Sequence, residues 1–172
     1  MDKLHILMKE MITYYEGDPK RIGHFTKVHS FAKLIGEMEQ LKQQEQMILE
    51  VAALVHDIGI KPAEEKFGSA NGKLQELEGP APASELLDRI GFDAAVIERV
   101  CYLVGHHHTY TNIDGVDYQI LVEADFLVNL YEDAAEENVI RTAGERIFKT
   151  VSGLDLLRKI YGLKDDEKMN SR

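Results

Sequence analysis

Several ionisable side chains occupy positions where a helix would normally carry apolar residues. His24 lies four residues before Val28, at the head of an apolar stripe with the spacing of one helix face. His56 and Asp57 adjoin at the end of a segment that is apolar almost all round, and Asp125 lies on the apolar stripe of a further expected helix. This placement predicts that two imidazoles and two carboxylates face the interior.

Buried carboxylates need a partner, because removing an unpaired carboxylate from water costs several kcal/mol. Asp57 and Asp125, together with the two histidines, therefore predict a shared cation. Nitrogen and oxygen donors suit Fe, Mn, Co, Ni or Zn, and they suit Mg where water fills several coordination positions. The set contains no thiolate, which argues against a closed structural zinc site, and open coordination positions favour catalysis.

Each of these residues has a simpler interpretation when taken alone. A histidine on an apolar face, such as His24, is more often a hydrogen-bonded core residue than a ligand. Asp125 could cap a helix or pair within a bundle, and a dipeptide such as His56-Asp57 is common by chance. That all four residues would lie on the inward faces of three helices by chance is much less probable than for any one of them. We therefore favour the metal site.

Three segments resemble the HD superfamily of metal-dependent phosphohydrolases in order, spacing and helical setting, over roughly residues 20–130. They are RIGH at 21–24, AALVHDIG at 52–59 and VEAD at 122–125. The resemblance implies a single orthogonal helical bundle and hydrolysis of a nucleotide or another small phosphate ester. It also implies one metal site, with the ligands His24, His56, Asp57 and Asp125.

Many members of the superfamily hold a second metal through two further histidines between the His-Asp pair and the final aspartate. The run His106-His107-His108 supplies one of them, and we expect His107 first and His106 second, because position 107 continues an apolar stripe. At the other position the chain has Glu78 where a histidine is usual. Glu78 could bind metal through oxygen, or its charge could favour the adjoining helix N-terminus. The resemblance therefore implies one or two ions.

The expected chemistry is attack on phosphorus by a metal-activated water, with the metal also binding a phosphoryl oxygen. Asp57 could bridge two ions where both are present. Lys61, just beyond the ligand pair, and Arg21, about one turn before His24, could each pair with a phosphate, although a surface cation explains either equally well. His29 faces about 140° away from His24 on the same helix and is left out of the site.

Three classes of function fit this pattern. The first is a phosphohydrolase acting on a nucleotide or other small phosphate ester. The second is a di-iron oxygenase of the same superfamily, which needs two irons and therefore ligation by Glu78 and a histidine from 106–108. The third is a non-catalytic sensor that binds a nucleotide in the same pocket, and the intact ligand set argues against it.

Helical periodicity recurs along the chain and strand-type alternation does not, which predicts an all-α fold. We expect helices at about 2–15, 19–36, 44–57, 82–91, 93–106, 116–138 and 142–161. Gly, Pro and the Asn71-Gly72 pair predict a long irregular connection over 58–79. This connection and the segment 109–117 flank the ligands and are expected to shape the pocket, where Tyr110 could stack on a base. The acidic run 132–137 is interpreted as a solvated helix face.

The chain has 172 residues, 44% of them hydrophobic, which predicts a single domain over 1–172 with a motif-bearing core at about 20–130 and a polar tail at about 164–172. Cys101 is the only cysteine, so no intrachain disulfide can form and a reducing cytoplasm is the expected location. No signal peptide or membrane-spanning segment is recognisable.

The formal net charge of −10 disfavours duplex nucleic acid and anionic membranes as partners. A small phosphorylated molecule, with a nucleotide as one option, is the expected partner, because a bound cation reverses the local sign of the field. An oligomer is also an option, since the apolar stripe of the first helix, Leu4, Leu7, Met8 and Met11, could pack on a second copy.

Overall fold

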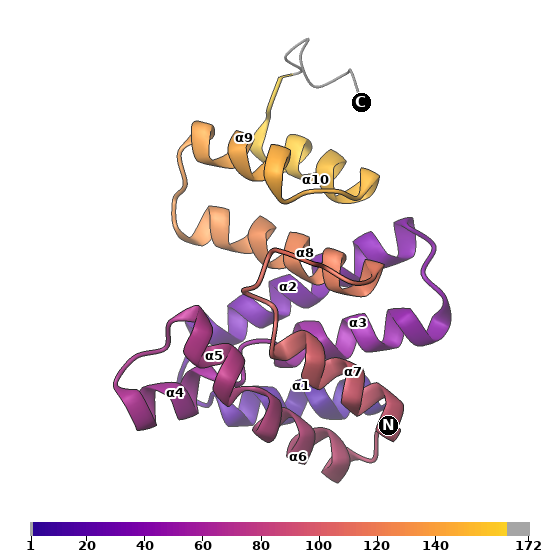
Figure 1. Cartoon of the computed structure of the whole chain (residues 1–172), viewed down its shortest axis with the longest axis vertical. Helices are drawn as coiled ribbons and strands as arrows, with labels where there is room; N and C mark the ends of the chain where they lie inside the picture. The colour runs from indigo at the N-terminus through magenta and orange to yellow at the C-terminus, as the bar shows by residue number, and fades with distance from the viewer. Residues whose placement is uncertain (1, 165–172) are drawn as a thin grey trace.

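The computed structural model describes residues 2–164, which form ten α-helices joined by turns and contain no strand (Figure 1). The helices are α1 Lys3–Tyr14, α2 Pro19–Met38, α3 Gln43–Val55, α4 Ile60–Phe67, α5 Gly72–Glu78, α6 Pro80–Ile90, α7 Ala94–Val104, α8 Val116–Glu132, α9 Glu137–Arg146 and α10 Val151–Tyr161. The predicted all-α class is confirmed. The expected tail at about 164–172 lies outside the described residues except for its first position.

The ends of the early helices follow local chemistry. Asp2 caps α1, where its carboxylate accepts a hydrogen bond from the backbone of Leu4 at 3.3 Å. Asp18 does the same for α2 through the backbone N–H of Arg21 at 3.0 Å, and Pro19 takes the first helical position, where its missing N–H costs nothing. The predicted starts of both helices are confirmed.

The irregular connection expected over 58–79 is wrong, because this segment contains α4 and α5. Gly68 ends α4 in the left-handed conformation at φ +65°. Asn71 then caps α5 by accepting a hydrogen bond from the backbone of Leu74 at 3.1 Å. The residues that we interpreted as loop formers therefore end one short helix and begin the next.

The expected helices at 116–138 and 142–161 also have the wrong boundaries. The first ends at Glu132, and Ala134 follows in the left-handed region at φ +49°. The second is two helices, because the chain breaks after α9 and Thr150 caps α10 by accepting a hydrogen bond from Gly153 N at 2.9 Å. Apolar periodicity continues across both breaks, so it could not locate them.

The core forms where α2, α3 and α8 pack on one another, with α7 and α1 against α3 and with α6 between α1 and α7. Helices α9 and α10 pack together beyond α8, and α4 and α5 pair to one side (Figure 1). Leu7 and Met11 of α1 are fully buried in this core. These two residues of the stripe therefore pack in the core of the same chain and not on a second copy, and an oligomer stays a prediction.

Within residues 2–164, no helix is both long enough and apolar enough to cross a bilayer.

Candidate metal centre

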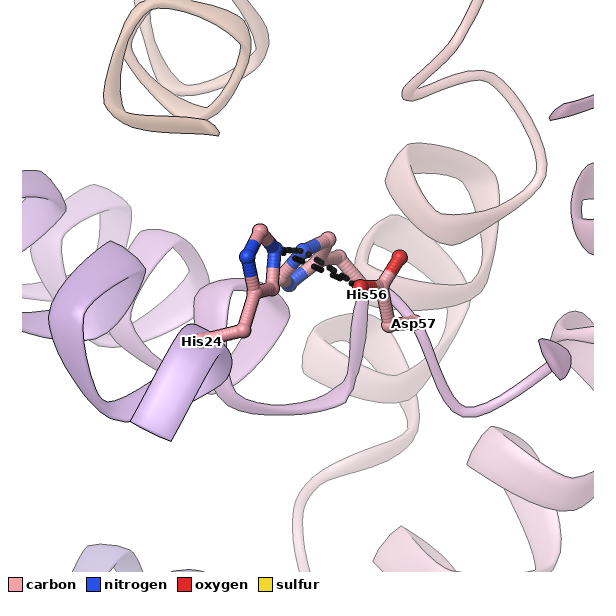
Figure 2. A group of neighbouring side chains, drawn as sticks. All are labelled: His24, His56 and Asp57. Carbon is pink, nitrogen blue, oxygen red and sulfur yellow. Dashed lines mark hydrogen bonds and ion pairs between the residues drawn. The ribbon is translucent and has the colours of Figure 1, made fainter. Parts of the chain in front are cut away.

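The central helices bring the four predicted ligands into one cluster. His24 comes from α2, His56 and Asp57 from the turn after α3, and Asp125 from α8. Figure 2 shows the rings of His24 and His56 directed toward each other and toward the Asp57 carboxylate. The side chain of His56 is fully buried, and that of Asp57 is 18% exposed. The cluster therefore lies at the floor of an opening, with one carboxylate still accessible.

Backbone contacts fix the turn that carries His56 and Asp57. The hydroxyl of Tyr15 donates to the Asp57 carbonyl at 2.7 Å, and that of Tyr14 donates to the Ile58 carbonyl at 3.1 Å. Gly59 allows α5 to approach, because a Cβ at this position would lie 2.4 Å from the carbonyl oxygen of Gln75. Helix α1 on one side and α5 on the other thus hold the turn in place.

The atoms that face one another in the cluster are those that bind metals. His24 Nε2 lies 3.2 Å from His56 Nε2, and it lies 3.3 Å from Asp57 Oδ2 and 3.2 Å from Asp125 Oδ1. His56 Nε2 is 3.4 Å from the same Asp57 oxygen and 3.6 Å from the same Asp125 oxygen. Ligands about 2.1 Å from a common ion stand roughly 3.0–3.4 Å apart. His24, His56 and Asp57 therefore have the spacing that one ion requires, and Asp125 lies within 3.6 Å of both histidine nitrogens.

Hydrogen bonds at the opposite ring nitrogens leave Nε2 free to act as a ligand. His56 Nδ1 donates to the Ala53 carbonyl at 2.8 Å, and His107 Nδ1 donates to the Val104 carbonyl at 2.8 Å. When neutral, each ring then carries its lone pair on Nε2. His107 Nε2 is buried and has no hydrogen-bond partner in the described part of the chain. A buried nitrogen without a partner is costly, and a cation beside it would remove that cost.

The charges of the cluster stabilise one another. Burial alone lowers the pKa of His56, but Asp57 and Asp125 outweigh it and raise that pKa well above its usual range. Burial alone raises the pKa of Asp57, but His56 and His107 hold it well below its usual range. Asp125 follows the same pattern, since hydrogen bonds from His24 and His56 outweigh burial and lower its pKa. Both carboxylates are therefore ionised at neutral pH, as ligands must be.

A second group of potential ligands shares Asp57. The ligand atoms of Asp57, His107 and His108 lie within 4.8 Å of one another. Asp57 Oδ1, the oxygen that does not face His24, lies 3.5 Å from His107 Nε2. The Asp57 carboxylate thus has one oxygen near each group, which is the placement expected of a bridging ligand.

Two residues that we expected at the second group lie elsewhere. The Glu78 carboxylate forms an ion pair with the Lys66 ammonium and belongs to neither group. His106 donates from Nδ1 to the Tyr102 carbonyl at 2.7 Å and stacks on the Tyr102 ring, and it too joins neither group. The ligand roles of Glu78 and His106 stay predictions, which the geometry does not favour.

Helix α7 ends at Val104, so the three histidines lie in a turn and helical spacing does not apply to them. His107 has the inward position that we expected, for a different reason. His108 was not singled out, yet its Nε2 lies 3.0 Å from Gln75 Oε1 and its ring lines the cavity. Burial and the nearby His107 lower the pKa of His108 to about 4, so this imidazole is neutral near pH 7.

A cavity of about 320 Å³ opens over the cluster. Its walls include Arg21 and the neighbouring Lys20 at the start of α2. Arg21 is already paired with Glu64 at 2.6 Å and with Asp18 at 3.3 Å. Lys61 does not line the cavity, because its ammonium donates to the Tyr14 carbonyl at 2.9 Å. Of the two cations that we proposed for phosphate, only Arg21 faces the opening.

Other residues of the cavity wall were not expected. Glu132 was interpreted as part of a solvated face, but its side chain is only 16% exposed and contacts His24 Nδ1 at 3.0 Å. Asn129 donates to Asp125 Oδ1 at 2.9 Å. Both follow Asp125 on α8 at helical spacing, and this signal was available in the sequence. Tyr110 does not line the cavity and packs edge-on against Phe126.

The all-α bundle and the convergent histidines and aspartates together define a recognisable class. The chain belongs to the HD domain family, whose profile matches residues 21–149. The resemblance found in the three sequence segments is thereby confirmed.

The structure is similar to the crystal structure of a predicted HD superfamily hydrolase from an uncultured Thermotogales bacterium. The two are 25% identical, with a TM-score of 0.63, over 93% of this chain and 83% of that one. A search of curated proteins finds no match for the chain.

Proposed function

We propose that this protein is a metal-dependent hydrolase that cleaves a small phosphate ester. The proposed metal ligands are His24, His56, Asp57 and Asp125. The observation that carries the proposal is the convergence of two imidazole nitrogens and two carboxylate oxygens at the floor of a polar cavity, with each oxygen 3.2–3.6 Å from both nitrogens. Membership of the HD domain family and the similarity to a predicted HD superfamily hydrolase support it.

The ion would supply positive charge to a phosphoryl oxygen and lower the pKa of a water molecule. The chain supplies the rest of the site. His56 and His107 hold their Nε2 atoms in place through main-chain carbonyls, so little reorganisation of these two rings accompanies binding. Asp57, which is accessible on one side, belongs to both groups of potential ligands. The same carboxylate would accommodate either one ion or two.

Lys20 is the better candidate for a phosphate contact at the rim. Its ammonium is exposed and has no ion pair within residues 2–164, whereas Arg21 is shared by two carboxylates. A free ammonium pairs with a phosphate as a point charge and need not break an existing contact. We therefore assign Lys20 to substrate binding, with Arg21 beside it.

Turnover of a panel of phosphate monoesters and diesters with Mn²⁺, Co²⁺ or Mg²⁺ tests the proposal. Asp57→Ala should abolish both bound metal and phosphate release while the far-ultraviolet circular dichroism stays helical. Asp88→Ala, the same change at an exposed position on α6, is the matched control and should leave both unchanged. Full activity in Asp57→Ala would refute the proposal. Oxygen consumption with two bound irons, and no phosphate release, would favour the oxidative alternative.

A further inference from the structure

The His24 ring differs from the other buried rings of the cluster in what its second nitrogen contacts. In His56 and His107, Nδ1 donates to the main-chain carbonyl of a residue three positions earlier, Ala53 or Val104. In His24, Nδ1 lies 3.0 Å from the side-chain oxygen Oε2 of Glu132. The orientation of the His24 ring is therefore set by a carboxylate that lies 108 residues away in the sequence, and not by the local backbone.

Glu132 is itself held in place. Its second oxygen, Oε1, accepts a hydrogen bond from the Lys27 ammonium at 2.7 Å. Lys27 lies three residues after His24 on α2, so the two residues that contact Glu132 share one face of that helix. Glu132 is the last residue of α8 and lies seven residues, or about two turns, after Asp125. The same face of α8 thus carries the proposed ligand Asp125 and the Glu132 carboxylate, which contacts the ring of the proposed ligand His24.

The contact determines which nitrogen of His24 carries a proton. An ionised carboxylate can only accept a hydrogen bond, so Nδ1 must donate. In the neutral ring, Nε2 then carries the lone pair, and Nε2 is the atom that lies 3.2 Å from Asp125 and 3.3 Å from Asp57. Without Glu132, the His24 ring could rotate or adopt the other tautomer, and either change would remove the lone pair of Nε2 as a metal ligand.

We propose that Glu132, held by Lys27, is a positioning residue that fixes the orientation and tautomer of His24 and so raises the affinity of the site for a divalent metal. The proposal rests on the proposed metal site. A carboxylate that accepts the second N–H of a ligating histidine also makes its other nitrogen more basic, and removal of such partners weakens metal binding about 10–100-fold. Glu132 touches no substrate in this account and acts only through His24.

The test is the dissociation constant for Zn²⁺, measured by competition with a chromophoric chelator on metal-free protein. Glu132→Ala, which removes both the charge and the acceptor, should weaken binding by about 10–100-fold. Glu132→Gln keeps an acceptor oxygen and should lie between that variant and the original protein. Glu137→Gln is the matched control, because Glu137 belongs to the same acidic run but is exposed and paired with Arg141. It should bind Zn²⁺ unchanged.

A spectroscopic measurement separates positioning from a merely structural role. In the Zn²⁺-loaded protein with ¹⁵N-labelled histidine, long-range ¹H–¹⁵N correlation spectra should show His24 protonated at Nδ1 and bound through Nε2. Equal Zn²⁺ affinity in Glu132→Ala and the original protein would overturn the inference, as would His24 protonated at Nε2. Absence of Zn²⁺ binding by the original protein would instead overturn the proposed metal site.

Discussion

Two imidazoles and two carboxylates at hydrogen-bond distance form a cluster in which each charge depends on its neighbours. Asp57 and Asp125 raise the pKa of His56 although burial lowers it, and the histidines in turn keep both carboxylates ionised. Protons and a divalent ion therefore compete for the same atoms. The pairing of carboxylate and imidazole charges reduces the cost of placing these polar groups in the core.

A second carboxylate–imidazole pair, formed by the buried Glu50 and the partly buried His29, predicts how stability changes with pH. Burial alone raises the pKa of Glu50, but hydrogen bonds from His29 and Gln46 outweigh it and lower that pKa below its usual 4.5. A carboxyl group with a lowered folded-state pKa stabilises the protein above its unfolded pKa, and this contribution is lost as pH falls. The free energy of unfolding should therefore fall more steeply between about pH 5 and 3 in the original protein than in Glu50→Gln.

Denaturant titrations at several pH values measure this difference. Glu37→Gln, at an exposed glutamate of α2, is the control and should keep the slope of the original protein. Identical slopes in the original protein and in Glu50→Gln would show that the His29 contact does not stabilise the Glu50 carboxylate.

The four cluster residues could be found in the sequence because each stands out against an apolar stripe. Glu132 does not stand out in the same way, because it lies in an acidic run whose other charged members are exposed. Its spacing of seven residues from Asp125 was the one signal in the sequence that it shares the inward face of α8. The sequence also could not establish which of His106, His107 and His108 faces the cluster, because the apolar stripe of α7 cannot be extended past its end at Val104.

At the scale of elements, a buried carboxylate also joins α8 to the segment before α10. Glu123 is fully buried, and its Oε1 accepts from the backbone N–H of Lys149 at 2.6 Å and of Thr150 at 2.9 Å. Gln119 and the Thr150 hydroxyl donate to the same carboxylate. These contacts hold the break between α9 and α10, which sequence periodicity did not reveal because the partners are 26 and 27 residues apart.

Glu123→Ala should lower the free energy of unfolding by about 2–4 kcal/mol, because it leaves the buried backbone donor of Thr150 and the partly buried donor of Lys149 without an acceptor. Chemical denaturation of the metal-free protein measures the loss. Glu145→Ala, at an exposed position on α9, should change stability by less than about 0.5 kcal/mol. A small effect of Glu123→Ala would mean that water or a shifted loop replaces the carboxylate.

At the scale of the whole molecule, the proposed ligands come from α2, from the turn after α3 and from α8, and the same helices pack together in the core. The all-α class and these three elements could be predicted from periodicity. The α4–α5 pair could not, because its short helices are bounded by Gly68 and Asn71, which also signal loops. An ion bound by all four ligands would connect helices that are far apart in the sequence.

Binding of such an ion should raise the melting temperature. At a free metal concentration about one hundred times the dissociation constant, stabilisation is about 2.7 kcal/mol. For a protein of this size, that corresponds to a rise of roughly 5–10 °C. Differential scanning calorimetry with and without Mn²⁺ measures the shift, and Asp125→Asn should reduce it strongly. An equal shift in the variant would indicate that Mn²⁺ stabilises the protein from another site.

The most direct test of the central claim is an anomalous difference map from crystals grown with Mn²⁺. We predict a strong peak among His24 Nε2, His56 Nε2, Asp57 and Asp125, at coordination distance from all four residues. A strong peak elsewhere, or no peak in this cluster at saturating Mn²⁺, would contradict the assignment of these residues as the metal site.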